Sequence, residues 1–345
     1  EEIYLTVIYL NRKSLGRKWA DRKINHPHFF SSDLGGNAPG LKDLVKKSDL
    51  VIINYYQSLA SLSAISVCQS LEKPIIFWGE RPHEHKYSLI SRKIRSFIFK
   101  GWQSAGLGVW GIGSLAVEKY KSEFGDSYEY VNIPYYSNLS RFANSSDSES
   151  VNPLRTRSPV TFLYSGSLNH RKGVDVLAHA FLKLMAEGCK ARLVFLGDGE
   201  LRSALEVLLK DHMSMVEFLG FKDWEDLPGV YANADVLCVP SRHDGWALVV
   251  PEGLAAGLPV IATTTTGAAV DLIQQGVNGW LVPPDDVSAL ASAMSEAASL
   301  QVGTLEKMAN GAKESVARHQ LQDGAALFAT AARNAVQRHI RSARR

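Results

Sequence analysis

The chain contains 345 residues, 46% of them hydrophobic, which is enough for two domains that each bury a core. The 38 basic and 35 acidic side chains leave a formal net charge of only +3, which argues against nucleic acid as the main partner. Cys68, Cys189 and Cys238 are widely separated and fit neither a disulfide framework nor a zinc-ligand pattern. Because the sequence has no signal-peptide pattern and no apolar run as long as a membrane span, we expect a cytoplasmic protein.

Short apolar and β-branched runs alternate with helical patterns along the chain, which predicts an α/β fold with parallel sheets. We expect strands at residues 3–10, 50–54, 74–78, 106–111, 160–165, 192–197, 236–240 and 259–263. A polar stretch with two prolines between Asn144 and Pro159 is typical of a linker. The predicted domains are therefore residues 1–150 and 151–325, with a ligand between them at the carboxyl ends of the strands.

The run from Gly106 to Gly111 matches the dinucleotide fingerprint G-x-G-x-x-G. Its glycines interrupt the predicted strand instead of following it, and Ser114 just after them is the expected helix cap. No acid ends a following strand at the distance that the fingerprint requires. This pattern therefore does not favour a dehydrogenase, which would have to bind nicotinamide here.

Arg171 and Lys172 lie between the strand at 160–165 and an amphipathic helix, in a segment that begins with a glycine turn. Cations at the start of a helix oppose its dipole, at a small local cost that a bound anion would reverse. The pair therefore indicates a phosphate site. The alternative is that both are solvated charges near a helix start.

The densest signal lies after the strand that ends at Pro240. Asp244 is on a loop, and Glu252 is inside a helix that we expect to begin near Val249, with Pro251 in its first turn. Between the two acids, the backbone amides of residues 246–249 should be free. A diphosphate on these amides, with a carboxylate on each side for hydroxyl groups, is an arrangement suited to a nucleotide sugar.

Five segments then carry a specific resemblance: Lys172-Gly-Val-Asp, Gly197-Asp-Gly, Glu217-Phe-Leu-Gly, the pair Asp244 and Glu252, and the run from Gly276 to Asp285. In order and approximate spacing they resemble family 4 of the retaining GT-B glycosyltransferases, over about residues 160–295. The resemblance implies two Rossmann-like domains with parallel sheets facing across a cleft, and a helix at 326–345 that packs back across both. The first strand here resembles the family's second, so we expect that a first βα unit is missing.

The resemblance also implies roles for individual residues. Arg171 and Lys172 would bind the diphosphate, Glu252 the ribose hydroxyls, and Asp244 would lie by the donor sugar, although the family usually has Glu there and its contact could be displaced. Many members have Arg where this chain has Ser167, so Arg171 would take over part of that charge. The donor-binding candidates are Gly166, Ser167, Phe221, Lys222, Gly245, Trp246, Ala247, Leu248 and Val249.

The acceptor side is less well marked. Glu80, Arg81 and His83 follow the strand at 74–78 in a polar turn similar to one in some family members, and a plain surface turn is the alternative. Between Lys86 and Trp102, basic and apolar residues alternate at helical spacing. This helix is expected either to lie on an anionic membrane surface, as a peripheral contact at the inner face of the cell membrane, or to pack on the sheet.

Together these features predict a retaining, metal-independent glycosyltransferase with no cofactor beyond its nucleoside-diphosphate sugar. The expected acceptor is a hydroxyl of a lipid-linked or polysaccharide intermediate of cell-envelope glycan synthesis. Two alternatives stay open: a GT-B nucleotide-sugar epimerase, and an inactive homologue that binds nucleotide sugars without turnover.

Overall fold

The computed structural model describes residues 3–9, 26–34, 40–54, 58–82, 93, 108–145 and 159–344. It divides into two compact units. Unit 1 comprises Glu1–Ile112, Ala116–Ile133 and Ala325–Arg345, and unit 2 comprises Gly113–Leu115 and Pro134–Gly324. Each unit is described by itself below.

Unit 1 contains a parallel sheet of order β3-β4-β5-β6. Its strands are β3 (Val51–Ile53), β4 (Ile75–Gly79), β5 (Gly108–Gly111) and β6 (Tyr130–Asn132). The connections contain three helices: α1 (Leu41–Lys47) before β3, α2 (Leu59–Ser70) between β3 and β4, and α4 (Ser114–Phe124) between β5 and β6. A short 3-10 turn, η1, spans Ser31–Asp33. The strands β1 (Val7–Tyr9) and β2 (His28–Phe30) pair in parallel as a separate two-stranded sheet. Gly108 and Gly111 lie inside β5, and α4 begins at Ser114, as the sequence predicted.

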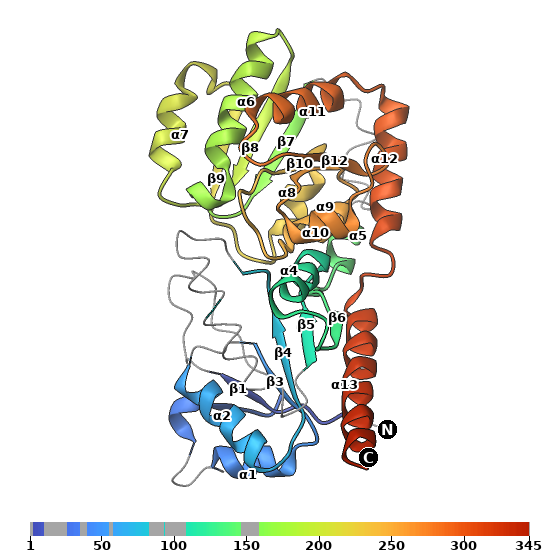
Figure 1. Cartoon of the computed structure of the whole chain (residues 1–345). Coiled ribbons are helices and arrows are strands. Elements are labelled where there is room, and N and C mark those ends of the chain that lie inside the picture. The colour runs from blue at the N-terminus through green and yellow to red at the C-terminus, as the bar shows by residue number, and fades with distance from the viewer. Residues whose placement is uncertain are drawn as a thin grey trace. The chain divides into compact units, whose positions relative to one another are not determined.

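The last helix, α13 (Leu321–Ala343), covers one face of the unit 1 sheet, and Figure 1 shows it in red alongside these strands. Ala331, Ala332 and Ala335 pack against a cluster that includes Ile76 and Trp110. Small side chains on this stripe allow the helix to approach the sheet closely. The second core of unit 1 lies between the sheet and the other helices, and includes Ile65, Phe77 and Tyr120.

Unit 2 contains a six-stranded parallel sheet of order β12-β11-β10-β7-β8-β9. The strands are β7 (Val160–Ser165), β8 (Ala191–Leu196), β9 (Val216–Gly220), β10 (Val236–Val239), β11 (Val260–Thr263) and β12 (Gly279–Val282). The strand order reverses between β7 and β10, which pair directly. Loops that leave such a pair diverge, and ligands bind in the crevice between them at the carboxyl ends of the strands.

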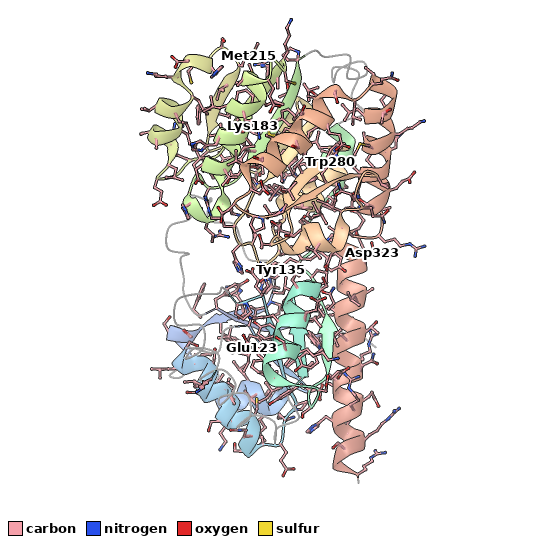
Figure 2. All side chains as sticks on the ribbon, turned by 45° about the horizontal axis from the view of Figure 1, so that its top comes forward. Glu123, Tyr135, Lys183, Met215, Trp280 and Asp323 are labelled. Carbon is pink, nitrogen blue, oxygen red and sulfur yellow. The ribbon has the colours of Figure 1, made fainter. Side chains whose placement is uncertain are left out.

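The helices of unit 2 cover this sheet (Figure 1). They are α5 (Ser140–Ser145), α6 (Val174–Ala186), α7 (Arg202–Leu208), α8 (Leu227–Ala232), α9 (Val249–Ala255), α10 (Gly267–Leu272), α11 (Val287–Ser299) and α12 (Val302–Ser315), with the 3-10 turns η3 (His170–Lys172) and η4 (Lys210–His212). Phe162, Phe181 and Phe195 belong to the main core, together with Trp280 of β12, which is labelled in Figure 2.

The boundary between the units differs from the one expected near residue 150. Residues 134–145 belong to unit 2, because α5 packs against α8 and α9. Residues 325–345 belong to unit 1 through the contacts of α13. The expected strands are otherwise present with ends shifted by a few residues, and all paired strands of the three sheets run in parallel.

Candidate active site

The loop after β7 places Lys172 at the strand-order reversal of unit 2. The side chain of Asn169 caps the turn η3 by accepting a hydrogen bond of 3.0 Å from the Lys172 amide. Gly173 follows with φ of +67°, and a Cβ atom there would lie 2.0 Å from the carbonyl oxygen of Pro240. Only glycine fits this position, so the loop after β7 packs directly on the loop after β10.

Lys172 and Asp244 form an ion pair between these two loops. The Lys172 ammonium donates to Oδ2 of Asp244, whose side chain is only 11% exposed. The Arg171 guanidinium lies 4.0 Å from the same oxygen and donates a 3.0 Å hydrogen bond to the carbonyl of His243. Arg171 is 45% exposed at its side chain and Lys172 is 17% exposed. Two cations thus converge on one carboxylate at the edge of the sheet.

Arg242 joins the loop after β10 to the first turn of α6, and its role was not predicted from the sequence. Its guanidinium donates two hydrogen bonds of 2.7 and 2.8 Å to Asp175 in the first turn of α6, and it pairs with Asp285 at 2.5 Å. It also donates to the carbonyl of His170 at 2.6 Å. Such bidentate pairs hold geometry well. No local pattern marks Arg242, because its partners lie far from it in the sequence.

The loop from Gly245 to Leu248 has a strained conformation. Ala247 has φ of +69°, which is rare for a residue with a side chain and is often found at functional sites. The next loop holds it in place, since the Gly267 amide donates to the carbonyl of Asp244 at 3.1 Å and the Ala268 amide donates to that of Trp246 at 2.7 Å. A Cβ atom on Gly267 would lie 2.2 Å from the Gly245 carbonyl oxygen, so the two loops touch at backbone distance.

This conformation leaves a row of backbone N–H groups available. Among the residues that the structure describes, none accepts a hydrogen bond from the amides of Gly245, Trp246, Ala247, Leu248 or Val249. Unpaired amides of this kind bind anions. The sequence expectation of free amides at 246–249 agrees with this geometry, and α9 begins at Val249 as predicted.

The indole of Trp246 is buried and anchors the loop. It stacks on His319 with ring centroids 5.7 Å apart, and His319 also stacks on Tyr136 at 4.3 Å. The imidazole Nε2 lies 3.1 Å from the carbonyl oxygen of Tyr135, which is labelled in Figure 2. Burial lowers the pKa of His319, opposed by this hydrogen bond and by the charges of Asp271 and Asp323. A neutral ring therefore supports the loop.

Glu252 lies in the first turn of α9 and is 9% exposed. Burial raises the pKa of its carboxyl to about 7, while the positive charge of Arg141 and the neighbouring hydroxyl of Tyr231 act in the opposite direction. Tyr231 is fully buried, and its hydroxyl also faces Ser165. The carboxyl of Glu252 therefore changes its protonation state near neutral pH.

Comparison with known families decides what kind of domain carries this site. Residues 159–299 match the model of the family described as Glycosyl transferases group 1. This part of the chain is therefore similar to the group 1 glycosyltransferases. The match begins at the strand that leads to Lys172 and includes Asp244 and Glu252.

Curated relatives that match this part of the chain are named as glycosyltransferases. The chain is 30% identical over 168 residues to the putative colanic acid biosynthesis glycosyltransferase WcaL of Salmonella typhimurium, covering 46% of this chain and 41% of that protein. It is 27% identical over 196 residues to a GDP-mannose-dependent phosphatidylinositol monomannoside mannosyltransferase of Corynebacterium glutamicum, covering 54% of this chain and 51% of that protein. The chain thus spans about half the length of these relatives, or less.

Solved structures share the fold over most of the chain. HepE of Anabaena, in complex with UDP, aligns with a TM-score of 0.71 at 17% identity, covering 89% of this chain and 85% of that one. Sucrose-phosphate synthase of Thermosynechococcus elongatus aligns with a TM-score of 0.70 at 19% identity, covering 95% and 88%. The prediction of an α/β protein with the GT-B fold is confirmed.

The other donor-side candidates follow the strands β7 and β9. Gly166, with φ of +149°, follows β7. Ser167 after it is exposed, and its carbonyl accepts a 2.7 Å hydrogen bond from the Tyr164 hydroxyl. Phe221 is 40% exposed and Lys222 is exposed on the loop after β9. Their proposed contact with a nucleotide base stays a prediction.

The acceptor-side candidates lie in unit 1. Glu80 follows β4, is exposed, and accepts a 2.7 Å hydrogen bond from the Tyr120 hydroxyl at its carbonyl, and Arg81 beside it is half-buried. His83 lies outside the described residues, as do residues 86–102 apart from Lys93. Among the described helices, none has the length and apolar character needed to cross a membrane.

Proposed function

We propose that this chain is a retaining glycosyltransferase that moves a sugar from a nucleoside-diphosphate donor to a hydroxyl group of a glycan or lipid-linked acceptor. One observation carries the proposal above all others. Two cations, Arg171 and Lys172, converge on Asp244, and the amides of the strained loop that follows Asp244 have no acceptor among the described residues. Cations and open amides at one place are a site for a diphosphate.

The carboxylates on either side suit the two sugars of such a donor. Asp244 lies beside the cations, where the transferred sugar would follow the diphosphate, and Glu252 lies one turn into α9, where the ribose would lie. Each carboxylate accepts hydrogen bonds from hydroxyl groups. The donor named for the Corynebacterium relative, GDP-mannose, and the UDP bound to HepE support a nucleotide sugar as donor.

In the reaction that we propose, the bond between the anomeric carbon and the diphosphate oxygen breaks as the acceptor oxygen bonds to that carbon from the same face. The configuration of the sugar is therefore retained, and the acceptor proton passes to the departing diphosphate. Arg171, Lys172 and the loop amides stabilise the negative charge that builds on the diphosphate. These cations do the work that a metal ion does in other transferases, so we propose that turnover needs no metal.

The acceptor that we propose belongs to cell-envelope glycan synthesis. This rests on the relatives, which include a putative colanic acid glycosyltransferase, and on the fold shared with the lipopolysaccharide outer core galactosyltransferase WaaB. We also propose that the protein works at the cytoplasmic face of the membrane, where lipid-linked acceptors are extended.

The deciding experiment incubates the purified chain with UDP-glucose, UDP-galactose, GDP-mannose and ADP-glucose, in chelator, with and without polyprenyl-diphosphate-linked saccharides. A glycosylated product of unchanged anomeric configuration, formed only with acceptor, is the expected result. Conversion of a donor without acceptor would instead identify an epimerase. Nucleotide binding without any turnover would identify an inactive homologue.

A further inference from the structure

The short helix α5 brings Arg141 into the donor unit from a part of the chain far from the group 1 motifs. Residues 134–145 belong to unit 2, and α5 contacts both α8 and α9, the helices of Tyr231 and Glu252. The two terminal nitrogens of Arg141 are inaccessible to solvent. An arginine guanidinium is seldom buried unless its charge is compensated by a nearby group.

Trp224 holds the Arg141 side chain in place. The centre of the guanidinium lies 3.3 Å from the centroid of the Trp224 ring and 5.0 Å from that of Phe142. Stacking of a planar guanidinium on an indole is favourable and fixes its orientation. Trp224 stands on the loop that begins with Phe221 and Lys222, the segment predicted to meet the nucleotide base.

The charge of Arg141 reaches Glu252. It is the largest of the influences that lower the pKa of that carboxyl against the effect of burial, and Tyr231 of α8 contributes the other. The elements β10, β11, α10 and α12 also pack against α9. Arg141 is the cation among the causes of this shift, and the helix that carries it packs against α9.

We propose that Arg141, stacked on Trp224, is a positioning residue whose charge supports the Glu252 carboxylate as the acceptor of hydrogen bonds from the donor's ribose hydroxyls. The inference rests on the proposed function, because it assigns a task to the same donor site. Through the stacking of Arg141 on Trp224, it also links the loop at 221–226 to Glu252. The segment predicted to contact the base and the carboxylate predicted to bind the ribose would then be structurally connected.

The first test measures the Kd of UDP, GDP and ADP by calorimetry between pH 5.5 and 9, for the wild type and variants. Arg141→Ala should move the pH midpoint of binding upward and weaken binding about ten-fold at pH 7, since one pKa unit corresponds to a factor of ten. The loss of nucleotide affinity in Arg141→Ala should become smaller towards pH 9. Arg141→Lys should restore most of the affinity at pH 7, because it keeps the charge, and Trp224→Leu should give an intermediate loss.

Arg192→Ala is the matched control. Arg192 is a half-exposed arginine of β8 that pairs with Glu217 at 3.7 Å, and it does not act on Glu252. Its removal should leave both Kd and the pH midpoint unchanged. An Arg141→Ala variant with wild-type affinity, or with the same fold loss at every pH, would overturn the proposal. So would an Arg141→Lys variant as weak as Arg141→Ala.

A second test needs no ligand and separates this inference from the proposed function. A double-mutant cycle of Arg141→Ala, Glu252→Gln and the variant with both substitutions, measured by urea denaturation, gives the coupling between the two side chains. The coupling should be present at pH 8.5, where Glu252 is charged, and largely lost at pH 5. If no nucleotide binds but this coupling is found, only the proposed function fails. If coupling is absent at both pH values, the role of Arg141 fails.

Discussion

The ammonium group of Lys172 contacts a carboxylate oxygen of Asp244, 72 positions further along the chain. The contact exists because β7 and β10 are direct neighbours, so the loops that follow them start at the same edge of the sheet. Gly173 then lets the first loop approach the backbone of Pro240. A cation and an anion are thereby held at a fixed place with little exposure, ready for a charged ligand.

Because Lys172 is shared with Asp244, replacing this acid should separate donor binding from turnover. In Asp244→Asn the lysine is free for the diphosphate, so the Kd of the nucleoside diphosphate should stay equal or become smaller. The contact to the transferred sugar is weakened, and kcat should fall about ten-fold or more, the size of one lost charged hydrogen bond. Calorimetry and initial rates on the same preparation check both. A parallel loss of affinity would contradict this division of roles.

The contact between the two loops makes Gly173 a test of the geometry. Gly173→Ala must adopt a left-handed conformation, which costs about 1–2 kcal/mol, and must also relieve a clash with Pro240, which adds roughly 1–3 kcal/mol. Gly188→Ala is the control, since Gly188 has φ of +80° but no atom within 4 Å of a Cβ. Urea denaturation of both variants should therefore show the larger loss for Gly173→Ala. Equal losses would mean that the loops are not in contact.

The carboxyl of Glu252 should make stability depend on pH. Its pKa is raised from 4.5 to about 7, so between these values the folded state binds more protons than the unfolded chain. Stability therefore falls as the pH rises through this range, by roughly 3 kcal/mol in all. Glu252→Gln removes this loss and should gain stability relative to wild type between pH 5 and 8.5, while nucleotide affinity drops.

The control for this measurement is Glu296→Gln, on the exposed side of α11. Water contacts that carboxylate in the folded and the unfolded state, so its substitution should have the same effect at both pH values. If Glu252→Gln behaves like Glu296→Gln, the environment assigned to Glu252 is wrong.

His319 should give a pH dependence of the opposite sign. Burial lowers the pKa of this ring from its usual value of 6.5. Below pH 6.5 the imidazole is therefore protonated to a greater extent in the unfolded chain than in the folded state. This contribution to stability is complete above pH 6.5 and is lost as the pH falls. His319→Phe keeps an aromatic ring against Trp246 but loses the bond to Tyr135, which is worth about 1 kcal/mol. Urea denaturation should show that the free energy of unfolding of this variant lies below that of the wild type at pH 8, and that the difference is smaller at pH 5. A deficit independent of pH would show that the ring does not titrate against folding.

The sequence predicted the parts of the fold and site that have local patterns. The strand at Val160–Ser165 and the start of α9 at Val249 follow from apolar runs and turn residues. The strands β6 and β12 were not predicted, because Asn132 in β6 and Gly279 at the start of β12 leave no continuous β-branched run. Arg141, Arg242 and His319 were missed, since each acts through partners distant in sequence. Only the folded chain brings Arg141 beside Trp224, or places His319 under Trp246.

The central claim is that Lys172 and its neighbours hold a nucleoside diphosphate, and the most direct measurement is calorimetric titration of UDP, GDP and ADP into wild type, Lys172→Ala and Lys190→Ala. Lys190 is an exposed lysine of the same unit and serves as the control. We predict that one nucleotide binds the wild type and the control equally well and binds Lys172→Ala ten- to more than a hundred-fold more weakly, with a similar loss in kcat/KM. Equal affinity for all three proteins would contradict the account.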